Sequence, residues 1–238
     1  MGRAYEVRKA SIAATGKAKS ALYMKASREI YMAAKGGSPD PRENLALRAV
    51  LEKYKGQSIP KDVIQRAIDK AQGKGAEDYI SATYEGFGPG QSMIIVETLS
   101  DNAKRAFSEV RAVFNHKGGK IADSGSVSYN FQRLGELDFK GSDPDNITEN
   151  LIMDDIDVKE VKTMEDGVIS VLVAPTDLSR AEKVLRDLGI EEFLANEITL
   201  IPDQTIELTG EELEKYQNFV DALNELDDVQ TVYTNVVL

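Results

Sequence analysis

The sequence predicts an α+β fold, in which an N-terminal three-helix bundle is followed by two ferredoxin-like α+β domains, the second inserted in the first. Apolar residues recur with a helical period between residues 21 and 72, whereas strand-like and helical runs alternate beyond Ala76. Residues 135–201 complete a β-α-β-β-α-β cycle of their own, and the segments on either side supply further strands and helices.

The bundle is predicted from three amphipathic stretches. The first covers residues 21–35 and stops at two glycines. The second repeats apolar residues at i, i+3, i+4 and i+7 from Leu47 and ends at Gly56. The third begins at Pro60, because proline is favoured in the first turn of a helix, and ends before Gly73.

Beyond the bundle the elements follow from apolar alternation and from capping residues. We expect strands at 92–99, 125–131, 135–139, 158–164, 168–174, 193–201, 204–208 and 229–236. We expect helices at 102–117, 144–154 and 178–188, and one more that begins with a capping box formed by Thr209 and Glu212. The predicted parts are a flexible basic arm (1–20), a bundle domain (21–78), a discontinuous α+β domain (79–133 plus 203–238) and an inserted α+β domain (134–202).

Charge divides the chain into a basic head, residues 1–75, and an acidic body, residues 76–238. The head holds 16 Lys and Arg against 7 Asp and Glu, and the body holds 13 against 33, so that a net charge of −11 conceals +9 and −20. The first 28 residues contain a single acid, Glu6. This segregation is typical of a contact with a polyanion, since solubility alone does not need the two signs to be separated.

Several classes of protein are excluded or disfavoured by residue types. The chain has no cysteine, which excludes disulfides, zinc thiolate sites and a cysteine nucleophile. His116 is the single histidine, so a histidine pair is excluded; beside Arg111, Lys117 and Lys120 it is expected to stack or to cap a helix. We find neither a signal peptide nor an apolar run of membrane-spanning length, and expect a cytoplasmic protein without a membrane partner.

The glycine-rich run at residues 84–90 matches neither a P-loop nor a dinucleotide-binding motif. We interpret it as a tight turn whose glycines adopt positive φ, with the rings of Tyr84 and Phe87 as an alternative nucleic-acid contact. Paired acids such as Asp227 and Asp228 lack the pattern of a metal-binding loop, and we interpret them as caps and solvating charge. No metal, cofactor or catalytic residue is predicted.

The chain resembles the YebC family over essentially its whole length. The resemblance is carried by residues 2–3 (Gly-Arg), 28–31 (Arg-Glu-Ile-Tyr), 59–68 (Ile-Pro-Lys-Asp-Val-Ile-Gln-Arg-Ala-Ile), 84–89 (Tyr-Glu-Gly-Phe-Gly-Pro) and 228–235 (Asp-Val-Gln-Thr-Val-Tyr-Thr-Asn). It departs at the start, where Ala4-Tyr5-Glu6 replaces a basic stretch with histidine and tryptophan, which fits a shorter-headed subgroup.

The resemblance implies a cytoplasmic, non-catalytic protein with a helical N-terminal domain and two α+β domains. Members are described as probable transcriptional regulators that bind DNA, or as translation factors that help ribosomes through proline-containing stretches, and mitochondrial relatives as translational activators of cytochrome c oxidase synthesis. The alternatives of DNA and ribosomal RNA stay open here. A third hypothesis is a protein-interaction module that uses the acidic body.

The residues predicted to contact nucleic acid are basic side chains of the head, together with one ring that takes the place of the tryptophan. They are Arg3, Tyr5, Arg8, Lys9, Lys17, Lys19, Lys25, Arg28 and Lys61.

Overall fold

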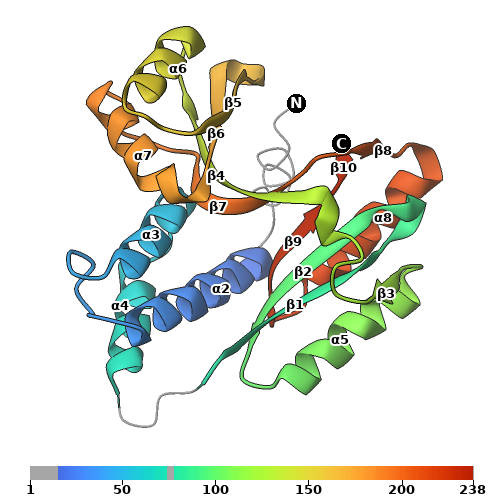
Figure 1. The fold of residues 1–238 in the computed structure, drawn as a ribbon. Coiled ribbons are helices and arrows are strands. Elements are labelled where there is room, and N and C mark those ends of the chain that lie inside the picture. The colour runs from blue at the N-terminus through green and yellow to red at the C-terminus, as the bar shows by residue number, and fades with distance from the viewer. Residues whose placement is uncertain (1–15, 74–77, 238) are drawn as a thin grey trace. The chain divides into compact units, whose positions relative to one another are not determined.

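The computed structural model describes residues 16–73 and 78–237, and its helices and antiparallel sheets confirm the α+β fold class (Figure 1). Its residues form two compact units. The insert unit contains residues 51–58 and 133–201, and the main unit contains the other described residues. Within the described residues the chain passes between the units after Val50, Ser58, Gln132 and Ile201. The predicted division into an arm, a bundle and two domains stays a prediction.

The three predicted helices of the head are present. They are α2 (Gly16–Lys35), α3 (Leu45–Tyr54) and α4 (Lys61–Gln72), and Pro60 is the N-cap of α4. Asn44 fixes the turn before α3, because its Nδ2 donates to the carbonyls of Ala33 and Ser38 while its Oδ1 accepts from the amide of Leu47. The apolar period therefore predicted these elements correctly.

The main unit contains a four-stranded antiparallel sheet. Its strands are β1 (Ile80–Phe87), β2 (Met93–Ser100), β3 (Lys120–Ala122) and β9 (Val229–Thr234), in the order β3-β1-β2-β9. Helices α5 (Ala103–His116) and α8 (Gly210–Asn224) pack on the sheet, where the rings of Phe114 and Phe219 meet edge to face with centroids 5.0 Å apart. Two short strands, β8 (Ile206–Glu207) and β10 (Val236–Val237), pair in parallel beside it.

Three sequence predictions for the main unit are wrong. The glycine-rich run was predicted as a turn, but most of it belongs to β1. The β1–β2 hairpin lies at the centre of the sheet, and the strand order is not ferredoxin-like. The predicted strand at 125–131 is mostly a loop and a 3₁₀ turn, because its amides bind a side chain rather than a neighbouring strand. Thr209 is the N-cap of α8, but its side chain makes no capping hydrogen bond, so the capping box is absent.

The insert unit has the predicted ferredoxin-like order. It consists of β4 (Phe131–Lys140), α6 (Pro144–Met153), β5 (Val158–Thr163), β6 (Val168–Val173), α7 (Leu178–Asp187) and β7 (Ala195–Pro202). The sheet order is β5-β6-β4-β7, which is a split β-α-β arrangement. Its core gathers Leu137, Phe139, Val171 and Leu185, because alternate strand residues face the two helices.

Candidate nucleic-acid interface

Several predicted contact residues lie outside the described part of the chain or at its edge. Arg3, Tyr5, Arg8 and Lys9 precede residue 16, so their role stays a prediction. Lys17 lies in the first turn of α2. The described interface therefore begins with the remaining residues of α2.

The structure places the other four predicted residues in different environments. Lys19 is exposed near the start of α2, and Lys61 is exposed as the first residue of α4. Lys25 is half-buried, and Arg28 points into the protein toward buried polar groups. Exposed lysines are available to a phosphate, whereas Arg28 already has protein partners.

Helices α2 and α4 pack against each other and form a platform for these side chains. Gln72 at the end of α4 donates from Nε2 to the carbonyl of Ala34, at 3.2 Å. Two ammonium groups lie near the ring of Tyr31, those of Lys35 and Lys70, at 5.9 and 5.8 Å from its centroid. Apart from Tyr31, the buried apolar residues of α2 and α4 are small or branched: Ala26, Ile30, Ala34, Ala67, Ile68 and Ala71.

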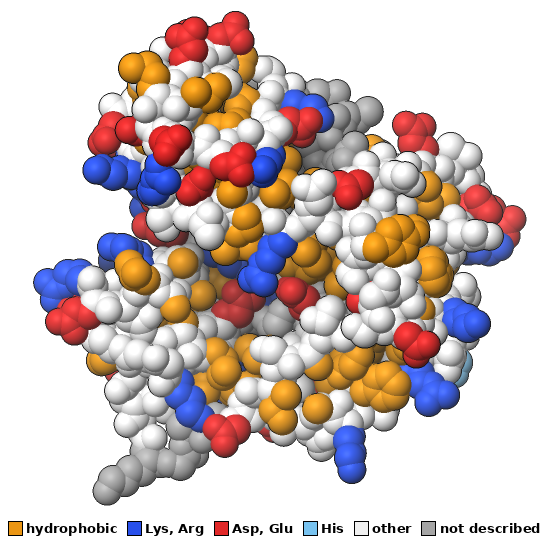
Figure 2. All heavy atoms as spheres, viewed as in Figure 1, with side chains coloured by type: hydrophobic (Ala, Val, Ile, Leu, Met, Phe, Trp, Pro, Cys, Tyr) orange, Lys and Arg blue, Asp and Glu red, His pale blue; other side chains and the backbone are white. Residues whose placement is uncertain are grey.

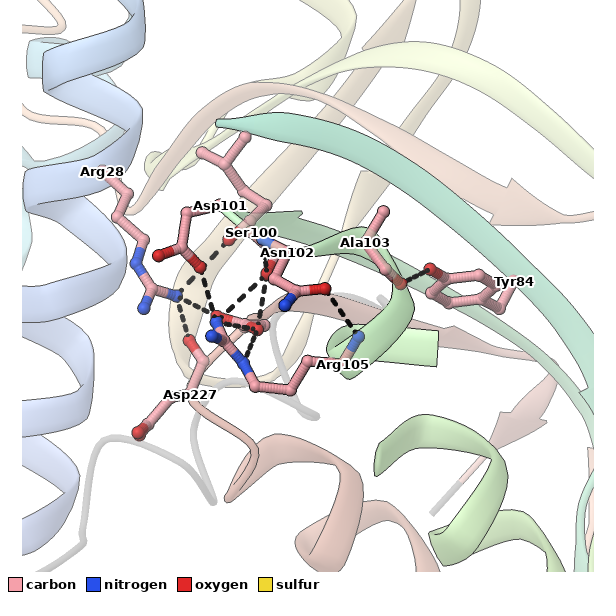
Figure 3. Close-up of polar contacts among 10 residues, drawn as sticks. Arg28, Tyr84, Ser100, Asp101, Asn102, Ala103, Arg105 and Asp227 are labelled. Atoms are coloured by element: carbon pink, nitrogen blue, oxygen red, sulfur yellow. Dashed lines mark hydrogen bonds and ion pairs between the residues drawn. The ribbon is translucent and has the colours of Figure 1, made fainter. Parts of the chain in front are cut away.

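Arg28 ties α2 to the end of the sheet (Figure 3). Its Nη1 lies 3.2 Å from Oδ1 of Asp228 and donates to the main-chain carbonyls of Asp227 and, at 3.4 Å, Leu99. The guanidinium also lies over the ring of Tyr79, 5.7 Å from its centroid. These contacts make Arg28 a positioning residue for α2.

Asp228 is shared between two arginines from different helices. Nη2 of Arg105 on α5 lies 2.8 Å from Oδ2 of Asp228 and 2.7 Å from Oδ1 of Asp101, and the hydroxyl of Ser100 donates to Asp228 at 2.7 Å. The hydrogen bonds to Asp228 and then to Asp101 raise the pKa of the Arg105 guanidinium. A carboxylate that is only 2% exposed is tolerated because it is paired and hydrogen-bonded. The interpretation of Asp228 as solvating charge is wrong, and that of Asp227 is not affected.

Sequence reasoning missed Asp228 and Arg105 as structural residues. The available signal was that Asp228 begins the run at 228–235, one of those that carry the family resemblance. An acid beside a second acid looks like a solvated pair unless the fold that buries it is known. Arg105 gave no signal, since its position in the first turn of a helix normally disfavours a cation.

Most described cations of the head have a carboxylate partner. Arg42 pairs with Asp40 and Arg66 with Asp62, each close by in the sequence. Lys35 pairs with Asp78, which is distant in the sequence. Among the described residues of the head, Lys19, Arg48 and Lys61 are exposed and have no carboxylate partner. The available positive charge of the head is therefore smaller than its formal charge.

Tyr84 and Phe87 lie in β1 rather than in a turn. The Tyr84 ring packs on Phe107 of α5 with centroids 5.5 Å apart, and Phe87 is half-buried. The turn itself follows at η2 (Pro89–Gln91), where Gly90 has φ +65°. Gly86 is needed for another reason, because a Cβ there would lie 2.4 Å from Cε1 of Phe114. The predicted ring contacts with nucleic acid stay a prediction.

Glu85 anchors the loop that replaced the predicted strand. Its two carboxylate oxygens accept from the amides of Gly125, Val127 and Ser128, at 2.8, 2.8 and 2.9 Å. Burial opposes ionisation of Glu85, but these three donors together hold its pKa below the ordinary value. The conspicuous residues of the run at 84–89 thus serve the structure of the main unit.

Neither a metal-binding group of side chains nor a membrane-spanning helix is found in the described residues. Residues 16–73 and 78–237 contain no group of three or more His, Asp and Glu side chains placed to hold a metal ion. No helix within the same ranges is long and apolar enough to cross a membrane.

The motifs at residues 28–31, 84–89 and 228–235 meet in one structural unit, with Arg28 paired to Asp228 and β1 adjacent to the strand that pairs with β9. Residues 3–74 match the family model for the TACO1/YebC N-terminal domain, and residues 79–236 match the model for the second and third TACO1/YebC domains. The chain belongs to the TACO1/YebC family.

Relatives in this family match along the whole chain. One is "Probable transcriptional regulatory protein YeeN" from Escherichia coli strain K12, 47% identical over 236 residues, with 99% of both chains covered. Another is "Probable transcriptional regulatory protein Mmwyl1_2868" from Marinomonas sp. strain MWYL1, 46% identical with the same coverage. The crystal structure of the conserved hypothetical protein Aq1575 from Aquifex aeolicus is similar, with a TM-score of 0.78 and 32% identity over 92% of this chain and 90% of that one.

Proposed function

We infer that this TACO1/YebC protein is a non-enzymatic regulator of gene expression that binds nucleic acid through its basic head. The observation that carries the proposal is the separation of charge into +9 for residues 1–75 and −20 for residues 76–238. The names of the relatives, probable transcriptional regulatory proteins, support a regulatory role. The same names make DNA the first candidate partner.

The head supplies positive charge on a rigid support. Packing of α2 on α4 and the Arg28–Asp228 pair fix the platform, so that Lys19 and Lys61 extend from it into solvent. Lysines contact phosphate oxygens as point charges and carry no base specificity by themselves. The proposed contact is therefore with backbone and shape, together with Arg3, Tyr5, Arg8, Lys9 and the other predicted residues of the arm.

Ribosomal RNA is the second candidate partner. Backbone and shape contacts suit structured RNA at least as well as duplex DNA, because A-form helices are recognised mainly in this way. The protein would then be a ribosome-associated translation factor that assists elongation through proline-rich stretches. Its basic head would have the same role in either case.

A protein-interaction module is the third candidate. The observation that favours it lies in the insert unit, where β5 is an edge strand and Ile152 and Met153 on α6 are 60% and 84% exposed. In this reading the acidic body makes the functional contact. Deleting residues 1–15 leaves α2 whole. The deletion keeps activity in this reading, whereas in the nucleic-acid reading it weakens binding because it removes Arg3, Arg8 and Lys9.

The test compares partners and variants at matched salt. The full chain, a Lys19→Gln/Lys61→Gln variant and a Lys140→Gln/Lys183→Gln control are assayed by co-sedimentation with ribosomes and by mobility shift of duplex DNA. Losing two phosphate contacts should make the plot of log affinity against log salt shallower by about 1.8 on duplex DNA. Preference for ribosomes would select the RNA alternative, and equal behaviour of variant and control would exclude contacts by these two lysines.

A further inference from the structure

A basic segment lies within the acidic body. Residues 104–120 contain five Lys and Arg against the single acid Glu109, whereas the other residues of the body contain 8 against 32. The segment comprises most of α5, the glycine turn after it and the first residue of β3. A local charge of +4 therefore stands out against a background of −24.

Apart from Arg105, which binds Asp228, the cations of this segment lie on the exposed surface of α5 and of the residues that follow it. The inner surface buries Ala106, Val110 and Phe114. Lys104 and Arg111 are exposed and two helical turns apart, about 10 Å along the axis. His116, Lys117 and Lys120 continue the exposed surface past the end of the helix. We call Lys104, Phe107, Arg111, His116, Lys117 and Lys120 the α5 face.

Four of these cations have no carboxylate partner among the described residues: Lys104, Arg111, Lys117 and Lys120. Among the other cations of the body, Lys159 pairs with Asp157, Arg180 with Asp177 and Lys215 with Glu211. Arg133, Lys140 and Lys183 are exposed and have no carboxylate partner among the described residues, but they do not form a basic run in the sequence. In Figure 2 blue side chains project from the surface over α5 and β3, with the histidine at the edge of the view. The α5 face thus presents positive charge that no ion pair among the described residues uses.

The helix dipole does not explain this arrangement. Cations near the end of a helix are stabilised by its negative pole, which accounts for His116 and Lys117. Lys104, however, is the second residue of α5, where the positive pole disfavours a cation, and the first turn has no acid to offset it. Solubility does not require it either, because the body is already strongly charged.

We propose that the α5 face is a second nucleic-acid contact that binds the sugar-phosphate backbone. The separation of Lys104 and Arg111, about 10 Å along α5, equals the axial rise of about three nucleotides of one strand of a duplex, at about 3.4 Å each. Phe107, 37% exposed between these two cations, offers part of a ring for a base. The acidic surroundings repel phosphate elsewhere on the body and so confine the backbone to this face.

The α5 face lies outside the head. The inference rests on the proposed function in one respect, that the partner is a nucleic acid. The test uses the full chain with Lys104→Gln/Arg111→Gln/Lys117→Gln. The control is Arg133→Gln/Lys140→Gln/Lys183→Gln, which removes the same charges from exposed positions elsewhere in the body. Affinity for a duplex DNA and for a ribosomal RNA hairpin is measured against salt concentration.

The α5 variant should bind at least about tenfold more weakly near 0.1 M salt, with a salt slope on DNA shallower by about 2.7, while the control stays close to the unaltered chain. Equal affinities for the α5 variant and the control would overturn the proposal. So would a variant that keeps its affinity for nucleic acid but loses binding to polyglutamate, since the face would then fit an acidic protein. Loss in the α5 variant without loss in the Lys19→Gln/Lys61→Gln variant would support the face and exclude contacts by Lys19 and Lys61.

Acetylation of the unaltered chain provides a readout that does not depend on the folding of a variant. Bound nucleic acid should protect Lys104, Lys117 and Lys120 from acetylation, and it should leave Lys183 as reactive as in the free protein. Unchanged reactivity of the three lysines at saturating nucleic acid would contradict the proposal.

Discussion

The head and the α5 face are both basic, but they use their charge differently. In the described head most cations are paired with carboxylates, as Arg28 is with Asp228 and Lys35 with Asp78, and Lys19, Arg48 and Lys61 have no such partner. On the α5 face no cation has a carboxylate partner within the described part of the chain, whereas Arg105, which precedes the face's Phe107 on the same helix, binds Asp228. The formal charge of the head therefore overstates the positive charge that a partner can reach, and the formal charge of the body conceals the positive charge of the α5 face.

The largest expected effect concerns the paired cations. Asp228→Ala leaves Arg28 and Arg105 without their shared carboxylate, and we expect a loss of about 3 kcal/mol in the free energy of unfolding. Urea denaturation measures it. Asp227→Ala is the matched control, because Asp227 contributes a main-chain carbonyl to Arg28, and it should change stability little. Equal losses in both variants would show that the ion pairs do not matter.

A second prediction concerns Glu85, a buried acid whose partners are main-chain amides. Glu85→Gln places an amide donor against main-chain amides, and should cost about 2 kcal/mol at neutral pH. Because the folded-state pKa of Glu85 is lowered, its stabilisation is present above the ordinary pKa of 4.5 and is lost as the pH falls through the folded value. Denaturation at a series of pH values should thus show a smaller acid-induced loss in Glu85→Gln than in the unaltered chain. Parallel curves would mean that Glu85 is not stabilised as a carboxylate.

The smallest effect separates positioning from contact within the head. Arg28→Gln should lower stability by about 1 kcal/mol, since it removes one partner of a buried carboxylate. Lys61→Gln, at an exposed and unpaired site, should leave stability within about 0.5 kcal/mol. Thermal denaturation of both variants measures the difference. A Lys61 variant as unstable as the Arg28 variant would contradict the distinction between paired cations that position helices and exposed cations that are free to contact a partner.

The sequence predicted the amphipathic helices and the whole β-α-β-β-α-β order of the insert unit, because both follow from local apolar periods. It did not predict β1, since Gly86 and Gly88 look like a turn unless the close approach of Phe114 is known. It also showed neither the contact between Arg28 and Asp228 nor the burial of Asp228, while the predicted contact of Arg28 with nucleic acid stays a prediction. Whether a charge is available depends on residues 200 positions away in the sequence, which no local pattern contains.

The central claim is that the chain binds nucleic acid through phosphate contacts made by its unpaired cations. The most direct test is the affinity of the full chain for duplex DNA measured over a range of salt concentrations. Contact with about five phosphates predicts a slope of about −4.5 in log affinity against log salt, and the α5 face makes it steeper. An affinity that does not change with salt, or no binding at low salt to either DNA or ribosomal RNA, would contradict the account.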